Sequence, residues 1–164
     1  MGSELESEAR RADCGANMGH TYTQLLYHVI WSTKERRPLI DSAWQAGLLA
    51  YMGGIARQEF GHLHAANATP DHVHALLSIR TDIALCRAMN RLKSLSSAWA
   101  KDHASGFAWQ GGYAAFTVSR SQEAAVRAYI AGQEEHHRRQ TFEEEFIAFL
   151  DRHGIEYDPR YVFD

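Results

Sequence analysis

The chain has 164 residues, of which 45% are hydrophobic and 23% charged, a composition typical of a globular protein that buries its own core. No stretch reaches the roughly 18–20 apolar residues that a membrane span needs, and no apolar run follows the charged N-terminus. We therefore expect no membrane segment and no secretory signal. Two cysteines cannot form a disulfide framework, so a cytoplasmic location is the expectation.

The formal net charge of −3 hides an uneven distribution. Residues 1–17 carry −2 and residues 140–164 carry −5, so the segment between them carries +4. A mildly basic body with acidic ends is compatible with a phosphate-bearing ligand.

Residues 1–17 are polar, charged and small, without periodicity, and are predicted to be a disordered leader. Residues 18–164 contain no repeat and no low-complexity linker, which favours a single domain.

Hydrophobic periodicity and turn residues predict the secondary structure in chain order. The expected elements are a strand over 21–33, a helix over 42–60 with Asp41 as N-cap, strands over 62–68 and 72–79, a helix over 82–103 capped by Asp82, a strand over 113–118, a helix over 120–138 with a capping box at Ser119 and Gln122, and a short helix over 141–153.

The order strand, helix, strand, strand, helix, strand is that of the split βαβ, or ferredoxin-like, arrangement. We expect an α+β fold with an antiparallel sheet, two helices on one face, and further C-terminal helices. Because this fold serves many unrelated functions, function must be argued from particular residues.

The segment His72-Val73-His74 is the first candidate site. Residues two apart on a strand share a face, so both imidazoles project together while Val73 points into the core. Paired imidazoles can bind a divalent metal. A pair of solvent-facing strand histidines is the alternative.

Tyr129 and Gln133 form the second candidate, four residues apart on a predicted helix and so on one face. A tyrosine phenolate can attack phosphorus, and a glutamine amide oxygen can bind a metal. Gly132 in the same helix suggests close packing against that face. The alternative is an amphipathic helix with a half-buried tyrosine.

Basic residues recur along the body of the chain, with aromatic residues among them. This combination is typical of single-stranded nucleic-acid binding, and Trp109, in a glycine-rich loop, is the aromatic residue expected to be exposed. The candidate nucleic-acid contacts are Lys34, Arg36, Arg37, Arg91, Lys93, Trp109 and Arg120.

Taken together, these motifs resemble the single-tyrosine HUH transposases of the insertion-sequence 200/605 type, including the REP-associated tyrosine transposases. The resemblance runs from about His20 to Asp164. It rests on YHVIWSTKERRPLI, TPDHVHALLSI, RLKSLSSAW, FAWQGGYAAFTVS and YIAGQEEHHRRQTFEEEF in this order.

The resemblance implies that His72 and His74 are the HUH metal ligands, Gln133 the third ligand and Tyr129 the nucleophile. It also implies a homodimer in which active sites are shared between subunits, a Mg²⁺ or Mn²⁺ ion, and hairpin-forming single-stranded DNA as substrate. Attack by Tyr129 would leave a 5′-phosphotyrosine and a free 3′-hydroxyl, which a second strand could use for rejoining.

Three alternatives remain open at this point. The first is a domesticated REP-type single-strand endonuclease that does not move itself. The second is a non-catalytic ferredoxin-like module that binds a metal or small ligand. The third is a zinc-dependent hydrolase, but no acidic general base stands at a telling spacing from the histidines.

Overall fold

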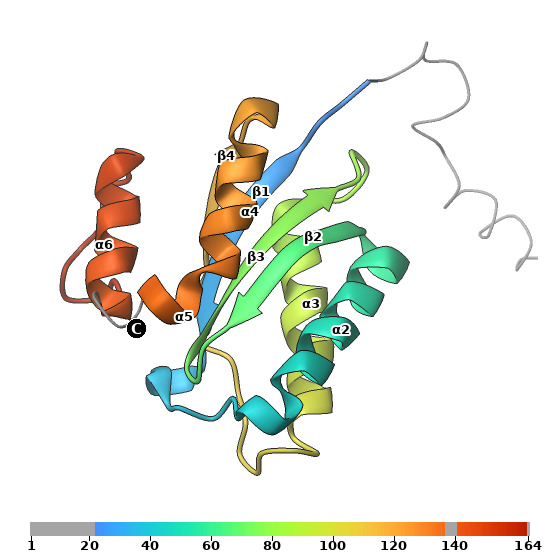
Figure 1. Ribbon diagram of the computed structural model, residues 1–164, viewed down its shortest axis with the longest axis vertical. Coiled ribbons are helices and arrows are strands. Elements are labelled where there is room, and N and C mark those ends of the chain that lie inside the picture. Colours follow the sequence, from blue (N-terminus) through green and yellow to red (C-terminus); the bar gives the residue numbers. More distant parts are fainter. Residues whose placement is uncertain (1–21, 137–140, 164) are drawn as a thin grey trace, which may run out of the picture.

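The structure is a computed structural model that describes residues 22–136 and 141–163. The predicted leader over 1–17 lies outside the described residues. Within them, four strands form one antiparallel sheet in the order β2-β3-β1-β4, with β1 and β3 paired at its centre. This is the predicted ferredoxin-like arrangement (Figure 1).

The elements follow the expected chain order. They are β1 (Leu26–Ser32), η1 (Lys34–Arg36), α2 (Ser42–Glu59), β2 (Gly61–Ala68), β3 (His72–Ile79), α3 (Leu85–Ala100), β4 (Ala114–Val118), η2 (Arg120–Gln122), α4 (Glu123–Ala131), α5 (Gln133–His136) and α6 (Phe142–Arg152).

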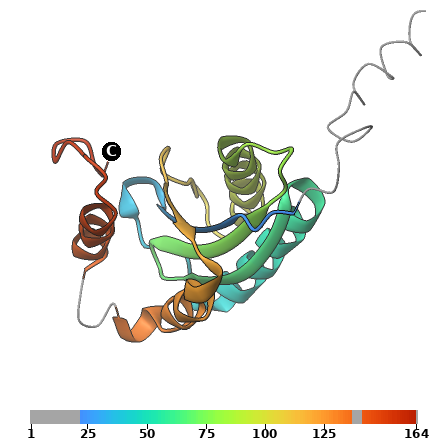
Figure 2. The same ribbon diagram turned by 90° about the horizontal axis from the view of Figure 1, so that it is seen from above.

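The two faces of the sheet are covered by different helices (Figures 1 and 2). Alternation along β3 sends Val73, Ala75 and Leu77 into the main core beneath α2 and α3. The opposite face carries two smaller clusters. Leu76 packs with Ile130 of α4, and Ile30 packs with Leu150 of α6. The side chains of His72 and His74 belong to this second face.

Of the predicted helix caps, the structure confirms the one at Asp41 and contradicts the one at Asp82. Asp41 caps α2 as expected, since its carboxylate accepts from Ala43 N at 2.8 Å. The Asp82 cap is wrong: α3 begins at Leu85 without a side-chain cap, because the Asp82 carboxylate pairs with Arg80 at 3.3 Å.

The capping box expected at Ser119 is also wrong, because Ser119 Oγ bonds to Ser121 Oγ and a 3₁₀ turn precedes α4. A complete capping box starts α6 instead, formed by Thr141 and Glu144. This box provides partners for backbone N–H groups at the start of α6.

Trp109 is not the exposed aromatic residue that the sequence suggested. It is only 9% exposed, and its Nε1–H donates to Ser96 Oγ at 3.0 Å. The glycine-rich loop folds back along the end of β1, with Gln110 N donating to Ser32 O at 2.9 Å. Backbone pairing of Trp109 with Thr33 places the indole beneath the sheet, where it packs edge-on against Phe107 and Trp31. The expectation that Trp109 is exposed is therefore wrong, and its assignment as a nucleic-acid contact loses that support.

No helix within the described residues is both long and apolar enough to cross a membrane.

Trp109→Ala should lower the free energy of unfolding by about 3–5 kcal/mol, as expected for deleting a buried aromatic side chain. The measurement is urea unfolding followed by circular dichroism. Trp109→Phe, which keeps a ring in the core, should leave the DNA affinity of the folded protein unchanged. A weaker DNA affinity in Trp109→Phe without lost stability would contradict the buried role.

Candidate active site

His72 and His74 lie side by side on the face of β3 away from α2 and α3, with ring centroids 5.3 Å apart. The β1–β3 register places Ser32 opposite His72 and Ile30 opposite His74. The predicted shared face is therefore correct. The alternative of solvent-facing histidines is not, since the two residues are only 1% and 0% exposed.

Each imidazole is held through its Nδ1 by another side chain. His72 Nδ1 lies 2.7 Å from Asp71 Oδ1 and 2.7 Å from Thr69 Oγ1. His74 Nδ1 lies 3.0 Å from Nε2 of His28, which rises from β1. Engagement of one ring nitrogen orients the other, as in metal sites whose outer residues fix the ligating imidazoles.

The charges of these supporting groups follow from their surroundings. Burial would raise the pKa of Asp71, but the hydrogen bond and charge of His72 outweigh it, so this pKa lies below its usual value. Burial, reinforced by the neighbouring His74 and His153, lowers the pKa of His28 to about 3. At neutral pH His28 is uncharged and Asp71 is a carboxylate.

The helix carrying Tyr129 differs from the prediction. Instead of running over 120–138, α4 ends at Ala131, and Gln133 begins α5. Asn67 of β2 takes up the carbonyl of Ile130, with its Nδ2 at 3.0 Å, and so ties the end of α4 to the sheet.

Gly132 lies at this break rather than in a helix interior. A Cβ added there would meet nothing closer than Ala128 O at 3.4 Å, within its own helix. The close packing that the sequence suggested at Gly132 is therefore absent among the described residues.

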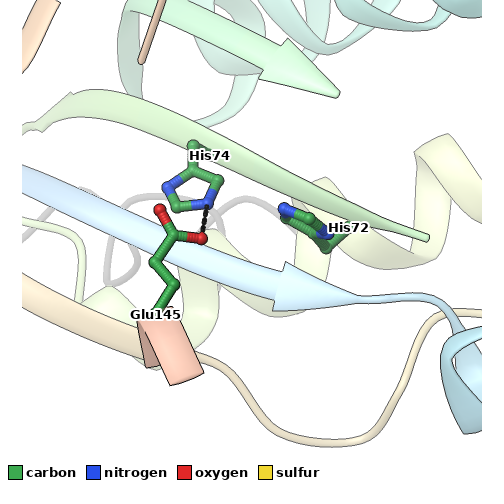
Figure 3. A group of neighbouring side chains, drawn as sticks. All are labelled: His72, His74 and Glu145. Carbon is green, nitrogen blue, oxygen red and sulfur yellow. Dashed lines mark ion pairs between the residues drawn. The ribbon is translucent and has the colours of Figure 1, made fainter. Parts of the chain in front are cut away.

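Glu145 of α6 joins the two predicted groups into one site. Figure 3 shows its carboxylate facing His74, with His72 alongside. The Tyr129 hydroxyl donates to Glu145 Oε1, and Gln133 Nε2 donates to the same oxygen at 3.3 Å. Glu145 Oε2 lies 3.4 Å from His74 Nε2. The carboxylate is 2% exposed, and burial raises its pKa to about 7, although the nearby His72 acts in the opposite direction.

The sequence did not single out Glu145, because this residue stands in the acidic run Glu143-Glu144-Glu145 of the negatively charged segment 140–164. One signal was present. The apolar positions Phe142, Phe146 and Phe149 define the inner stripe of α6, and Glu145 falls within it.

The residues present fit a divalent cation. One ligand atom from each of His72, His74 and Glu145 lies within 4.8 Å of the others. Gln133 Oε1 is buried, and no donor among the described residues reaches it. Two imidazole nitrogens, an amide oxygen and a carboxylate oxygen are a mixed set that divalent first-row metals and Mg²⁺ accept.

Four side chains meet within one chain, namely those of His74, Tyr129, Gln133 and Glu145. The Tyr129 and His74 ring centroids are 6.0 Å apart, and Gln133 contacts the same Glu145 carboxylate as Tyr129. The family resemblance implied that Tyr129 and Gln133 reach the histidines of a second subunit. In this structure Tyr129 and Gln133 lie beside the histidines of their own chain, and the sharing of sites between subunits stays a prediction.

Most of the basic residues predicted to contact DNA form ion pairs or hydrogen bonds with other residues of the chain. Arg36 pairs with Glu143, Arg120 pairs with Glu123, and Arg91 forms a two-nitrogen contact with Glu59. Lys93 donates to the carbonyls of residues 110–112, and burial lowers the pKa of Lys93 to about 8.

Lys34 and Arg37 differ from these residues. They are exposed and, in the part of the chain that the structure describes, form no ion pair. Their turn is anchored beside the start of β3, because Thr33 N donates to Asp71 O at 2.7 Å. Of the predicted DNA contacts, these two cations are best placed near the site.

Comparisons with known proteins show the family of the chain. The sequence profile of the family described as "Transposase IS200 like" matches residues 21–133. The chain is 30% identical to the ISDra2 transposase TnpA of Deinococcus radiodurans over 128 residues, which cover 70% of this chain and 87% of that protein.

Two solved structures share the fold. A crystal structure from Deinococcus radiodurans with a provisional transposase designation is 28% identical, covers 72% of this chain and 98% of its own, and has a TM-score of 0.56. A REP-associated tyrosine transposase bound to a REP hairpin is 13% identical, covers 74% of each chain, and has a TM-score of 0.55. The family match spans β1 to Gln133 and includes the histidine strand and Tyr129, and the chain belongs to the IS200-like transposase family.

Proposed function

We propose that this protein cleaves and rejoins single-stranded DNA through a 5′-phosphotyrosine on Tyr129, with a divalent ion held by His72, His74 and Gln133. One observation carries the proposal. The Tyr129 hydroxyl, the Gln133 amide and the His74 imidazole all meet the same buried carboxylate, so a nucleophile and metal-binding groups converge on one point.

In the proposed reaction the Tyr129 oxygen forms a bond to the scissile phosphorus, and the bond from phosphorus to the 3′-oxygen breaks. The phenolic hydrogen already points to Glu145 Oε1, which gives the proton a nearby acceptor. The leaving 3′-oxygen takes up a proton and becomes a free hydroxyl. A bound Mg²⁺ or Mn²⁺ would polarise the phosphate and stabilise the leaving oxygen. Attack by another 3′-hydroxyl reverses the step and joins a new strand.

DNA cannot reach the site in the arrangement described, because His72, His74 and Gln133 are each at most 1% exposed. The cover is α6, which also supplies Glu145. We infer that α6 shifts when a strand enters, so that a phosphate oxygen can approach His72, His74 and Gln133 while Glu145 still reaches Tyr129.

Hairpin-forming single-stranded DNA is the proposed substrate. The exposed cations Lys34 and Arg37 beside the histidine strand support phosphate binding. The similar REP-associated transposase is bound to a REP hairpin. Whether this protein mobilises its own gene or acts as a domesticated endonuclease depends on flanking DNA, and both roles use the same cleavage chemistry.

Each chain contributes one Tyr129, so two strand events require two chains, and we propose a homodimer whose sites are each complete in one chain. The competing function is a non-catalytic metal-binding module. It would bind Mn²⁺ through the same histidines but would form no covalent DNA adduct.

Tyr129→Phe should abolish the covalent adduct with hairpin DNA in the presence of Mn²⁺, assayed on a denaturing gel. Losing a hydroxyl that donates to the buried Glu145 carboxylate should lower the free energy of unfolding by about 1.5–3 kcal/mol. Tyr51→Phe, at an exposed tyrosine on α2, is the matched control and should retain the adduct. If Tyr129→Phe still forms the adduct, the nucleophile lies elsewhere, with Tyr113 the next candidate.

The double variant His72→Ala/His74→Ala should weaken Mn²⁺ binding by at least roughly 100-fold, measured by titration of the free-ion electron paramagnetic resonance signal. Glu145→Gln keeps the shape of the side chain but removes its charge, and should weaken binding less. Asp82→Asn, a comparable charge removal at a surface ion pair, should have no effect. Unchanged affinity in the double variant would remove the proposed metal site.

A mixture of His72→Ala/His74→Ala chains and Tyr129→Phe chains distinguishes sites within one chain from shared sites. With sites in cis, neither chain contains a complete set, and the mixture should form no adduct. Adduct formation by the mixture alone would mean that α4 reaches the histidines of a partner during cleavage. Wild-type protein taken through the same mixing procedure is the control.

A further inference from the structure

We propose that the cavity next to His72, between the end of β1, the loop 110–113, α6 and the C-terminal segment, binds one nucleobase of the single strand. This inference rests on the proposed function, because it assigns part of the substrate to a place beside the proposed metal site. It concerns recognition of the strand and not the cleavage step.

The cavity has a volume of about 240 Å³. Pockets for drug-sized ligands have about 300–1,000 Å³, so this one suits a single flat ring system and excludes a duplex. Its lining includes the aromatic rings of Tyr113, Phe142, Phe146 and Phe163. The rings of Phe142 and Phe146 are 5.6 Å apart, and those of Phe146 and Phe163 are 6.0 Å apart.

Polar groups at this cavity include hydrogen-bond donors. The Arg36 guanidinium lies 5.2 Å from the Phe163 ring centroid and lines the cavity together with Gln110. The indole of Trp31 also borders it. Its buried Nε1–H has no acceptor among residues 22–136 and 141–163. Nucleobases present ring faces for stacking and carbonyl or ring-nitrogen acceptors at their edges, which complements this lining.

The position of the cavity favours a base adjacent to the reacting phosphate. Phe142 lines the cavity and also packs against His72, with ring centroids 4.4 Å apart. Before α6 shifts, an occupant that stacks on Phe142 is therefore one side chain away from a proposed metal ligand. Arg36 also lines the cavity and belongs to the turn that carries Lys34 and Arg37, and this turn lies beside α6 (Figure 2). A strand entering along this turn would pass the cavity before its phosphate reached His72.

The test is a binding measurement without divalent metal, so that no cleavage intervenes. The probe is a fluorescein-labelled DNA hairpin with a single-stranded flank, in which an abasic residue replaces each flank nucleotide in turn. One abasic position next to the scissile phosphate should weaken binding by wild-type protein roughly tenfold, as expected for losing one stacked base. Abasic residues elsewhere in the flank should have smaller effects.

Phe146→Leu removes one ring but keeps apolar volume, and it should weaken binding of the intact hairpin by a similar factor. The abasic position should then cause no further loss, because base and ring form one interaction. Phe163→Leu, from the C-terminal segment, should behave in the same way and serves if Phe146→Leu fails to fold. Tyr51→Leu, on α2 and outside the cavity, is the control and should preserve the abasic penalty.

Equal binding of all abasic hairpins by wild-type protein would overturn the proposal, as would an abasic penalty that persists in both cavity variants. A change of oligomeric state in these variants with unaltered DNA affinity would overturn it too, since the cavity would then serve a protein contact. The covalent adduct assay keeps the two claims apart. Adduct formation without an abasic effect rejects only the nucleobase pocket, whereas the abasic effect without an adduct rejects only the cleavage chemistry.

Discussion

The buried carboxylate of Glu145 holds together parts of the chain that are far apart in sequence. It accepts from Tyr129 on α4 and from Gln133 on α5, and it lies 3.4 Å from His74 on β3. A carboxylate 2% exposed would be costly without partners, and burial raises its pKa to about 7. Its partners offset that cost, and a bound cation would offset it further. The price of closing the site in this way is that α6 shields it from DNA.

A second constraint is the register of the central strands. Pairing of β1 with β3 brings His28 diagonally next to His74, and their nitrogens lie 3.0 Å apart. At the end of β3, Asp71 and Thr69 hold His72. A shift of the β1–β3 register by one residue would turn His72 and His74 into the core beneath α2 and α3, and would turn Val73 toward α6. The hydrophobic burial that fixes this register therefore also fixes the orientation of the proposed ligands.

Charge on the surface is less available than the sequence suggests. Glu59, Glu123 and Glu143 pair with arginines that the sequence suggested as DNA contacts. The exposed pair Lys34 and Arg37 lies on a turn that backbone bonds anchor to the histidine strand. Near the site, the positive charge inferred from the sequence is thus limited to the turn with Lys34 and Arg37. The aromatic cavity lies next to this turn. This order suits a single strand whose phosphates and bases are bound by different groups.

The sequence by itself determined the strand and helix order, the shared face of His72 and His74, and the resemblance that singled out Tyr129 and Gln133, because periodicity and local spacing encode these features. It misjudged Trp109, since backbone pairing of the loop with β1 is a long-range contact with no local signature. It also missed His28 and Glu145. Their roles depend on strand register and on the packing of α6, which bring together residues 46 positions apart in one case and 16 in the other. Only the tertiary structure decided that Glu145 meets Tyr129, Gln133 and His74, because that follows from where α4 and α6 pack on the sheet.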